Sequence, residues 1–285
     1  MLKSLRTILS GTIDAWLHDE APRLSAALAF YTILSLAPLA VLVPQIVNSV
    51  GGRSVSQTQI INEVGNVIGP DGAKAVREMI EATKRPAGGT LASIMSVITL
   101  LFGASAVFGE LRSAMNKMWD VQSKENGGFV RLIRDRFFSF GIVLAVGFLL
   151  VVSLAVSTVL SELSAFLVET IPIGKAVVRI VDFVVSFGGM SILFALIFKY
   201  LPETDVQWKD VRLGSIATAF LFTIGKILIG VYLGNAGVGE AYGGGGSLIV
   251  VLVWVYYSSM IFFFGAEFTR VIARPMPGLS PGFRR

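Results

Sequence analysis

The chain has 285 residues, of which 54% are hydrophobic and only 15% are charged. These proportions lie outside the usual range of soluble domains. There is no cysteine, which excludes disulfides, thiolate metal sites and cysteine nucleophiles, and the single histidine, His18, cannot build a histidine cluster. The composition therefore predicts one membrane domain over residues 1–285, with no cofactor and no metal site.

The N-terminal segment has the pattern of an amphipathic helix. Apolar residues from Leu2 to Leu17 recur at helical spacing, while polar residues fall on the other faces. The segment lacks the uninterrupted apolar core and the small-residue cleavage site of a secretory signal. We expect residues 1–22 to lie in the membrane interface, with Pro22 breaking the helix.

Six stretches are long and apolar enough to cross a hydrocarbon core of ~30 Å. They are residues 26–47, 91–109, 137–160, 177–201, 213–233 and 248–272. The fold class is therefore all-α, a polytopic bundle of six transmembrane helices. Pro38 and Pro44 predict a kink or a break in the first span. Broken helices line ligand sites in transporters, whereas a kink absorbed by helix packing is the structural alternative.

Two connections also carry helical patterns. Residues 50–89 show two short amphipathic stretches around the Pro70 turn, which predict an outer helical hairpin. After the second span, apolar residues from Leu111 to Trp119 predict a helix that continues along the inner surface until Asn126.

The distribution of Lys and Arg predicts the orientation. Most of the 24 basic residues fall on the side that holds both termini, which places both termini in the cytoplasm. Such a basic face favours membrane lipids with anionic head groups as partners. A nucleic-acid partner is not expected, because the basic residues are divided among four segments separated by spans.

Charged residues inside the spans are the candidates for function, because they are costly there. Asp182 and Lys226 lie at matching depths in consecutive spans and are candidates for a polar pocket. The alternatives are a local pair of Asp182 with Arg179 and a Lys226 side chain that reaches the interface. Glu267, one turn before Arg270, predicts a structural salt bridge.

The glycine run after Tyr242 is a candidate hinge. It extends from Gly243 to Gly246 and is followed by Ser247, without the Lys that a phosphate-binding loop needs after its last glycine. We expect a flexible turn, with Ser247 capping the sixth span.

Small residues predict close helix packing. The triplet Phe-Gly-Ala occurs around Gly103 and again around Gly265, in spans that run in the same direction, so this echo does not support an inverted repeat. Gly230 and Gly234 form a GxxxG motif, and Ser105 and Gly109 form a small-xxx-small pair. Packing inside the bundle is the first interpretation of these residues, and dimerisation through GxxxG is the alternative.

Four ordered motifs resemble the YihY/BrkB family of bacterial inner-membrane proteins. They lie at residues 23–38, 115–119, 200–202 and 242–269, so the resemblance covers nearly the whole chain. It implies a six-span inner-membrane protein. Some members carry a virulence or serum-resistance label, some are linked to lipid or lipopolysaccharide export, and an old label calls the family ribonuclease BN.

The leading functional hypothesis is a transporter or flippase for a lipid or other amphiphilic envelope component. The alternative is a non-transporting scaffold or envelope-integrity factor with envelope protein partners. No enzymatic activity is expected. A metal-dependent ribonuclease needs clustered His, Asp or Glu ligands, and the acids here are scattered without ligand spacing.

Overall fold

The computed structural model describes residues 2–50, 90–121, 174–235 and 246–273, together with Lys74, Arg77, Glu78, Glu81, Gly237 and Tyr242. Every regular element in these residues is an α-helix. In chain order the helices are α1 (Leu2–His18), α2 (Ala21–Val50), α4 (Thr90–Met118), α6 (Gly174–Tyr200), α7 (Trp208–Asn235) and α9 (Gly246–Ala273). The predicted third span lies outside the described residues, as does almost all of the predicted outer hairpin.

The break between α1 and α2 lies before Pro22. Glu20 has a φ of 57°, a left-handed conformation that ends one helix and lets the chain start another. Pro22 is the second residue of α2, a position that suits proline because the N–H of the first turn needs no helical acceptor. The prediction that Pro22 breaks the helix is therefore wrong.

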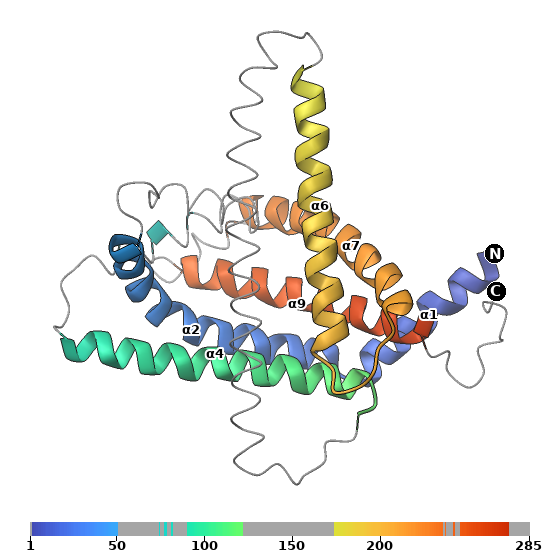
Figure 1. The fold of residues 1–285 in the computed structure, drawn as a ribbon, viewed down its shortest axis with the longest axis horizontal. Helices are drawn as coiled ribbons and strands as arrows, with labels where there is room; N and C mark the ends of the chain where they lie inside the picture. Colours follow the sequence, from blue (N-terminus) through green and yellow to red (C-terminus); the bar gives the residue numbers. More distant parts are fainter. Residues whose placement is uncertain are drawn as a thin grey trace.

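Helix α2 continues through both of its interior prolines. The backbone from Ala21 to Val50 is one helix that includes Pro38 and Pro44, and Figure 1 shows it bent along its length. Interior prolines bend a helix by removing a hydrogen bond and crowding the preceding turn. The described backbone therefore favours a bent helix over a broken one.

Helix α4 ends at Met118, earlier than predicted. Asp120 has a φ of 51°, and the Val121 N–H donates to the Asn116 carbonyl at 2.9 Å, which is the hydrogen-bond pattern of a Schellman cap. Met118 and Trp119 are buried in the core. The predicted continuation of the helix past the second span is confirmed as far as Met118, whereas the predicted end at Asn126 is wrong, because the helix is capped at Asp120.

Two helical hairpins form the body of the described structure. Helix α2 packs on α4, α7 packs on α9, and α2 also packs on α9. In Figure 1 α2, α4 and α9 run roughly along one another. The two Phe-Gly-Ala triplets lie at the hairpin contacts: a β-carbon on Gly103 would lie 3.0 Å from the Ser35 Cβ, and Gly265 is in contact with Thr218. The repeated triplet therefore brings two helices together in each hairpin.

Phenylalanine rings join α6 to this body. The Phe194 ring centroid lies 5.7 Å from that of Phe222 on α7, and the Phe198 centroid lies 5.3 Å from that of Phe262 on α9. Figure 1 shows α6 steeply inclined to α2, α4 and α9. Side chains from Ile180 to Val185 on its N-terminal half are exposed where they are described. Only the C-terminal half of α6 therefore belongs to the described core.

The described helices are those of a membrane protein. Three segments are long and apolar enough to cross a bilayer: Phe183–Tyr200, Trp208–Asn235 and Leu248–Ala273. Helices α2 and α4 have 30 and 29 residues, which also exceeds the ~20 residues that a span needs. Apolar side chains exposed along α7, as in Ile216 and Ile227, suit contact with lipid.

Candidate functional site: a charge cluster at one end of the bundle

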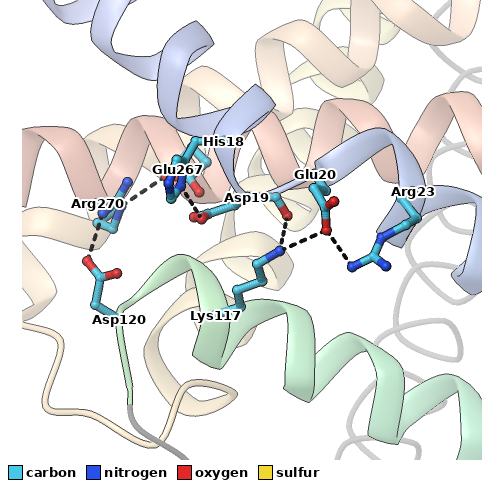
Figure 2. A network of polar contacts seen from close by, with 8 residues as sticks. All are labelled: His18, Asp19, Glu20, Arg23, Lys117, Asp120, Glu267 and Arg270. Carbon is cyan, nitrogen blue, oxygen red and sulfur yellow. Dashed lines mark hydrogen bonds and ion pairs between the residues drawn. The ribbon is translucent and has the colours of Figure 1, made fainter.

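Charged residues from α1, α2, α4 and α9 converge at one end of the described bundle, which we call the charge cluster. Its members are His18, Asp19, Glu20, Arg23, Lys117, Asp120, Glu267 and Arg270 (Figure 2). They come from the α1–α2 corner, from the C-terminal end of α4 and from the last turns of α9. The capped turns at Glu20 and Asp120 direct the chain at this end, so the local backbone places these side chains together.

Helix α1 is held against α9 by a small and polar face. Thr12 and Ala15 are buried, and the Trp16 Nε1–H donates to the Met260 carbonyl of α9 at 3.3 Å. The same face carries Asp19, just beyond the helix end, into the interior. Packing of α1 on α9 therefore brings an acidic residue from the start of the chain to Glu267.

The opposite face of α1 is apolar and exposed. Leu9, Ile13 and Leu17 follow one another at a spacing of four residues, and the Leu17 side chain is 56% exposed. An exposed apolar stripe on a helix that packs along a membrane protein is typical of insertion into the lipid interface. The amphipathic pattern of the sequence thus has its apolar side directed away from the protein.

Glu267 is the most deeply buried ionisable residue of the cluster. It lies within the candidate span Leu248–Ala273, and its side chain is 0% exposed. The Arg270 Nε–H donates to Glu267 Oε2 at 2.9 Å, so the ion pair expected between these residues is present. Glu267 Oε1 is also buried but receives no hydrogen bond from the described residues.

Arg270 connects α9 to α4. Its Nη1 lies 3.0 Å from Asp120 Oδ2, and the Asp120 side chain is 77% exposed. The guanidinium therefore bridges a buried carboxyl group and a solvent-accessible one. The Nε and Nη1 atoms of Arg270 each contact the carboxylate of a different residue. The planar guanidinium therefore fixes the positions of Glu267 and Asp120 relative to each other.

Asp19 faces both the interior and an exposed histidine. Its carboxyl group is a neighbour of the Glu267 carboxyl group in the cluster, and His18 Nδ1 lies 3.1 Å from Asp19 Oδ1. The His18 side chain is 87% exposed, whereas that of Asp19 is 8% exposed. The exposure of the side chains therefore falls from His18 through Asp19 to Glu267, and Figure 2 shows the three residues in one group.

Lys117 closes the cluster on the α4 side. Its Nζ donates to the Asp19 carbonyl at 2.9 Å and to Glu20 Oε2 at 3.3 Å. Glu20 also forms an ion pair with Arg23. Lys117 thus contacts the backbone of Asp19 and the side chain of Glu20, and it fixes the α1–α2 corner to α4.

A second set of contacts attaches the α6–α7 connection to α4. Arg112 Nη2 lies 2.8 Å from Glu203 Oε1, and the Glu203 backbone N–H donates to Asn116 Oδ1 at 2.8 Å. The Lys199 Nζ donates to the Val206 carbonyl at 2.6 Å, within the connection. We call Arg112, Asn116 and Glu203 the loop clamp.

The side chains of the charge cluster can bind and release protons. They can also bind an anion or a cation through single contacts. The cluster contains four carboxyl groups and three permanent cations beside His18. No group of three or more His, Asp or Glu side chains in metal-ligating geometry occurs in the part of the chain that the structure describes.

The residues predicted for a polar pocket are not brought together by any described contact. Lys226 is half-buried on α7, and Asp182 and Arg179 lie on α6 with side chains outside the described set. The neighbours of Asp182, including Phe183, are exposed. The pairing of Asp182 with Lys226 stays a prediction.

The predicted hinge at the glycine run is described only in part. Tyr242 is exposed, and Gly243 lies outside the described residues. Helix α9 begins at Gly246, so Ser247 lies inside its first turn. The side chain of Ser247 lies outside what the structure describes, so its role as a cap stays a prediction.

Sequence reasoning identified Glu267 and Arg270 but missed their neighbours Asp19 and Asp120, and it missed Lys117 as a further member of the cluster. An acid inside an apolar run is visible in the sequence, whereas Asp19 reaches it only through the packing of α1 on α9. The usable signal was the acidic pair Asp19 and Glu20 directly before an apolar span.

Comparison with known proteins gives consistent matches. The family model described as Virulence factor BrkB matches residues 12–282. A UPF0761 membrane protein of Stenotrophomonas maltophilia is 26% identical over 224 residues, which cover 77% of this chain and 50% of the relative. One of Ralstonia nicotianae is 26% identical over 225 residues, with 76% and 47% covered.

Other relatives align over more of their length. A UPF0761 membrane protein of Tolumonas auensis is 25% identical over 258 residues, which cover 90% of this chain and 82% of the relative. The chain spans about half the length of the Stenotrophomonas and Ralstonia relatives. No solved structure is significantly similar to it. Because the family match extends over most of the chain, the protein belongs to the Virulence factor BrkB family.

Proposed function

We propose that this protein moves a lipid or another amphiphilic envelope component across the membrane, as a transporter or flippase. The observation that carries the proposal is Glu267, an acidic residue inside a candidate span whose side chain is fully buried and whose Oε1 receives no hydrogen bond from the described residues. Ionisable groups in membrane spans are costly and commonly mark substrate or ion pathways. If Glu267 served only in a salt bridge, both of its carboxylate oxygens would be expected to accept hydrogen bonds.

The position of the charge cluster suits a gate. Its contacts join α9 to α4 through Arg270 and Asp120, and α4 to the α1–α2 corner through Lys117. Loss of these contacts would free the ends of three helices at once. We propose that the gate faces the cytoplasm of a bacterial inner membrane, because the surrounding segments are rich in Lys and Arg.

Lipid is the substrate class that the surface favours. The exposed stripe of Leu9, Ile13 and Leu17 supports a position of α1 in the interface, beside the charge cluster. Lys and Arg at this end attract anionic head groups by ~1 kcal/mol each near the surface. The printed names of the relatives state only that they are membrane proteins, so the substrate is part of the proposal.

Flux measurement in reconstituted liposomes tests this function. A fluorescent anionic lipid analogue is placed in one leaflet, and its movement is followed by chemical quenching from outside. We expect wild-type protein to accelerate movement over protein-free liposomes and Glu267→Gln to slow it by about tenfold or more, a change of ~1.4 kcal/mol. Asp205→Asn, on an exposed loop residue, is the matched control. Wild-type rates equal to protein-free rates, with several head groups tried, would reject the proposal.

A membrane scaffold is the second candidate, favoured by the tight contact of α7 and α9. Gly214 and Gly265 leave no room for a β-carbon between these helices, so a pathway between them is closed. A scaffold would show no flux, and Glu267→Gln would retain envelope integrity in cells. We propose no enzymatic activity, and incubation of the purified protein with RNA should leave the RNA intact.

A further inference from the structure

We infer that Asp19 and Glu267 together bind one proton, which exchanges with the solvent through His18. The charge cluster is then a proton-binding site. This inference rests on the proposed transport function and deepens it by naming the ion that would couple to the substrate. It assigns to His18, the single histidine of the chain, a role that its sequence context did not suggest.

The first support is the closeness of the two buried carboxyl groups. Asp19 and Glu267 are neighbours in the charge cluster (Figure 2), and their side chains are 8% and 0% exposed. Two ionised carboxylates repel each other strongly where water is excluded, whereas one proton between them makes a hydrogen bond. Glu267 Oε1, buried and without a described donor, is an oxygen that such a proton can occupy.

The second support is that the neighbouring cations are committed to other oxygens. Arg270 contacts Glu267 Oε2 and Asp120, and Lys117 contacts the Asp19 carbonyl and Glu20.

Arg23 contacts Glu20 as well, so no permanent cation in the cluster has a described contact with the Asp19 carboxyl group. Four carboxyl groups face three permanent cations. One bound proton therefore brings the cluster to neutrality, which a site inside a membrane protein favours.

The third support is the gradient of exposure from His18 to Glu267. His18 can take a proton from water at its Nε2 and pass its Nδ1 proton to Asp19 Oδ1, 3.1 Å away, which leaves a neutral imidazole with its proton on Nε2. Asp19 then transfers its proton to Glu267, and the reverse sequence releases it. Each transfer breaks one N–H or O–H bond and forms one N–H or O–H bond. The imidazole returns to its starting tautomer by losing the Nε2 proton to water and taking one at Nδ1, so water is the only other reactant.

Infrared spectroscopy of the reconstituted protein tests the site without measuring transport. A protonated carboxyl group has a C=O stretching band that is separate from the carboxylate bands. We expect wild-type protein at neutral pH to show such a band, equivalent to about one group per chain, which disappears in Glu267→Gln and in Asp19→Asn. Asp205→Asn should retain it. Gln and Asn preserve the shape of the side chains that they replace, so these variants are expected to fold. Gel filtration measures the folded yield of each variant alongside its spectrum.

The role of His18 is tested by the rate at which this band shifts after transfer to heavy water. His18→Gln should retain the band but slow its shift by about 100-fold, the lower end of what a positioned proton carrier contributes. Asp14→Asn, at an exposed position of α1, should leave the rate unchanged. An equal rate in wild type and His18→Gln would overturn the exchange route.

The remaining outcomes separate this inference from the transport function. Absence of the band in folded wild-type protein at every pH at which it stays folded would overturn the proton site, even if lipid flux is observed. Loss of the band when sodium replaces choline at constant pH would overturn it in favour of a monovalent metal ion. A band with all the expected variant effects, but no lipid flux in wild type, would support the proton site and reject the proposed function.

Discussion

Gly265 on α9 and Thr218 on α7 are in contact so close that a β-carbon on the glycine would overlap the threonine hydroxyl. The same relationship is repeated in reverse between Gly214 on α7 and Thr269 on α9. Each threonine hydroxyl donates to the carbonyl of the glycine four residues earlier on its own helix, at 2.6 Å for Thr218 and 2.7 Å for Thr269. The hydroxyls are thereby satisfied, and the helices can approach closely without an unpaired polar group.

Gly265→Ala is expected to destabilise the protein. The added methyl group meets the Oγ1 and Cβ of Thr218, both held by the helix backbone, so one helix must move. Overpacking of this kind costs about 1–3 kcal/mol. The measurement is the free energy of unfolding in mixed micelles. Gly230→Ala is the control, because no described atom lies within 4 Å of its β-carbon position, and this variant should be neutral or slightly more stable.

The helix positions follow from the sequence better than the contacts between helices do. The predicted spans at 26–47, 91–109, 213–233 and 248–272 all fall inside observed helices, because long apolar runs leave few alternatives. Helix ends were less predictable. Glu20 and Asp120 both adopt left-handed conformations that are uncommon for residues other than glycine.

Close packing inside the bundle was predicted at Gly230 and Gly109, where the described structure does not show it, and dimerisation through GxxxG stays a prediction. The motif of Gly230 and Gly234 indicated a tight interface, but the β-carbon position of Gly230 faces no described neighbour. The tight positions pair a glycine with a threonine on another helix, as in Gly265 and Thr218. The two residues of such a pair lie in different segments of the sequence, so no spacing pattern within one segment predicts the pair. Only the tertiary structure reveals it. The partnership of Glu267 with Asp19 escaped prediction for the same reason.

The two ion pairs of Arg270 should differ in strength. Asp120→Asn removes the exposed pair, and it should lower the free energy of unfolding by at most about 1 kcal/mol, with a smaller effect at high salt. Asn also tolerates the left-handed backbone of this position. Arg270→Gln leaves Glu267 without its charged donor in a buried place and should cost about 1.5–3 kcal/mol. Equal losses in the two variants, measured in the same micelles, would contradict this ranking.

Asp182 and Lys226 are predicted to interact across α6 and α7. If they pair, each single change, Asp182→Asn or Lys226→Met, leaves a polar group without its partner in the membrane. The double change should then cost less than the sum of the single changes in folded yield or flux. A second cycle with Arg179→Met is the comparison. Additive effects in the first cycle and coupling in the second would assign Asp182 to Arg179.

The orientation of the chain is predicted from its basic residues. Asp205 and Tyr242 are exposed at the two ends of α7, and the chain has no native cysteine to interfere with labelling. A membrane-impermeant maleimide should label Tyr242→Cys in intact cells and Asp205→Cys only after the inner membrane is permeabilised. The opposite pattern would place both termini outside.

Asn116→Ala should release the α6–α7 connection from α4. Asn116 Oδ1 accepts the Glu203 backbone N–H at 2.8 Å, and its loss leaves a partly buried donor unsatisfied, at a cost of about 1–3 kcal/mol. Hydrogen exchange of the Glu203 amide should therefore accelerate, while amides in the middle of α7 keep their rates. Asn235→Ala is the matched control, because the Asn235 side chain bonds only the Val231 carbonyl of its own helix among the described contacts. Unchanged exchange at Glu203 would mean that the Arg112 ion pair alone holds the loop clamp. In that case Arg112→Gln, which removes the charge on α4, should accelerate exchange where Asn116→Ala does not.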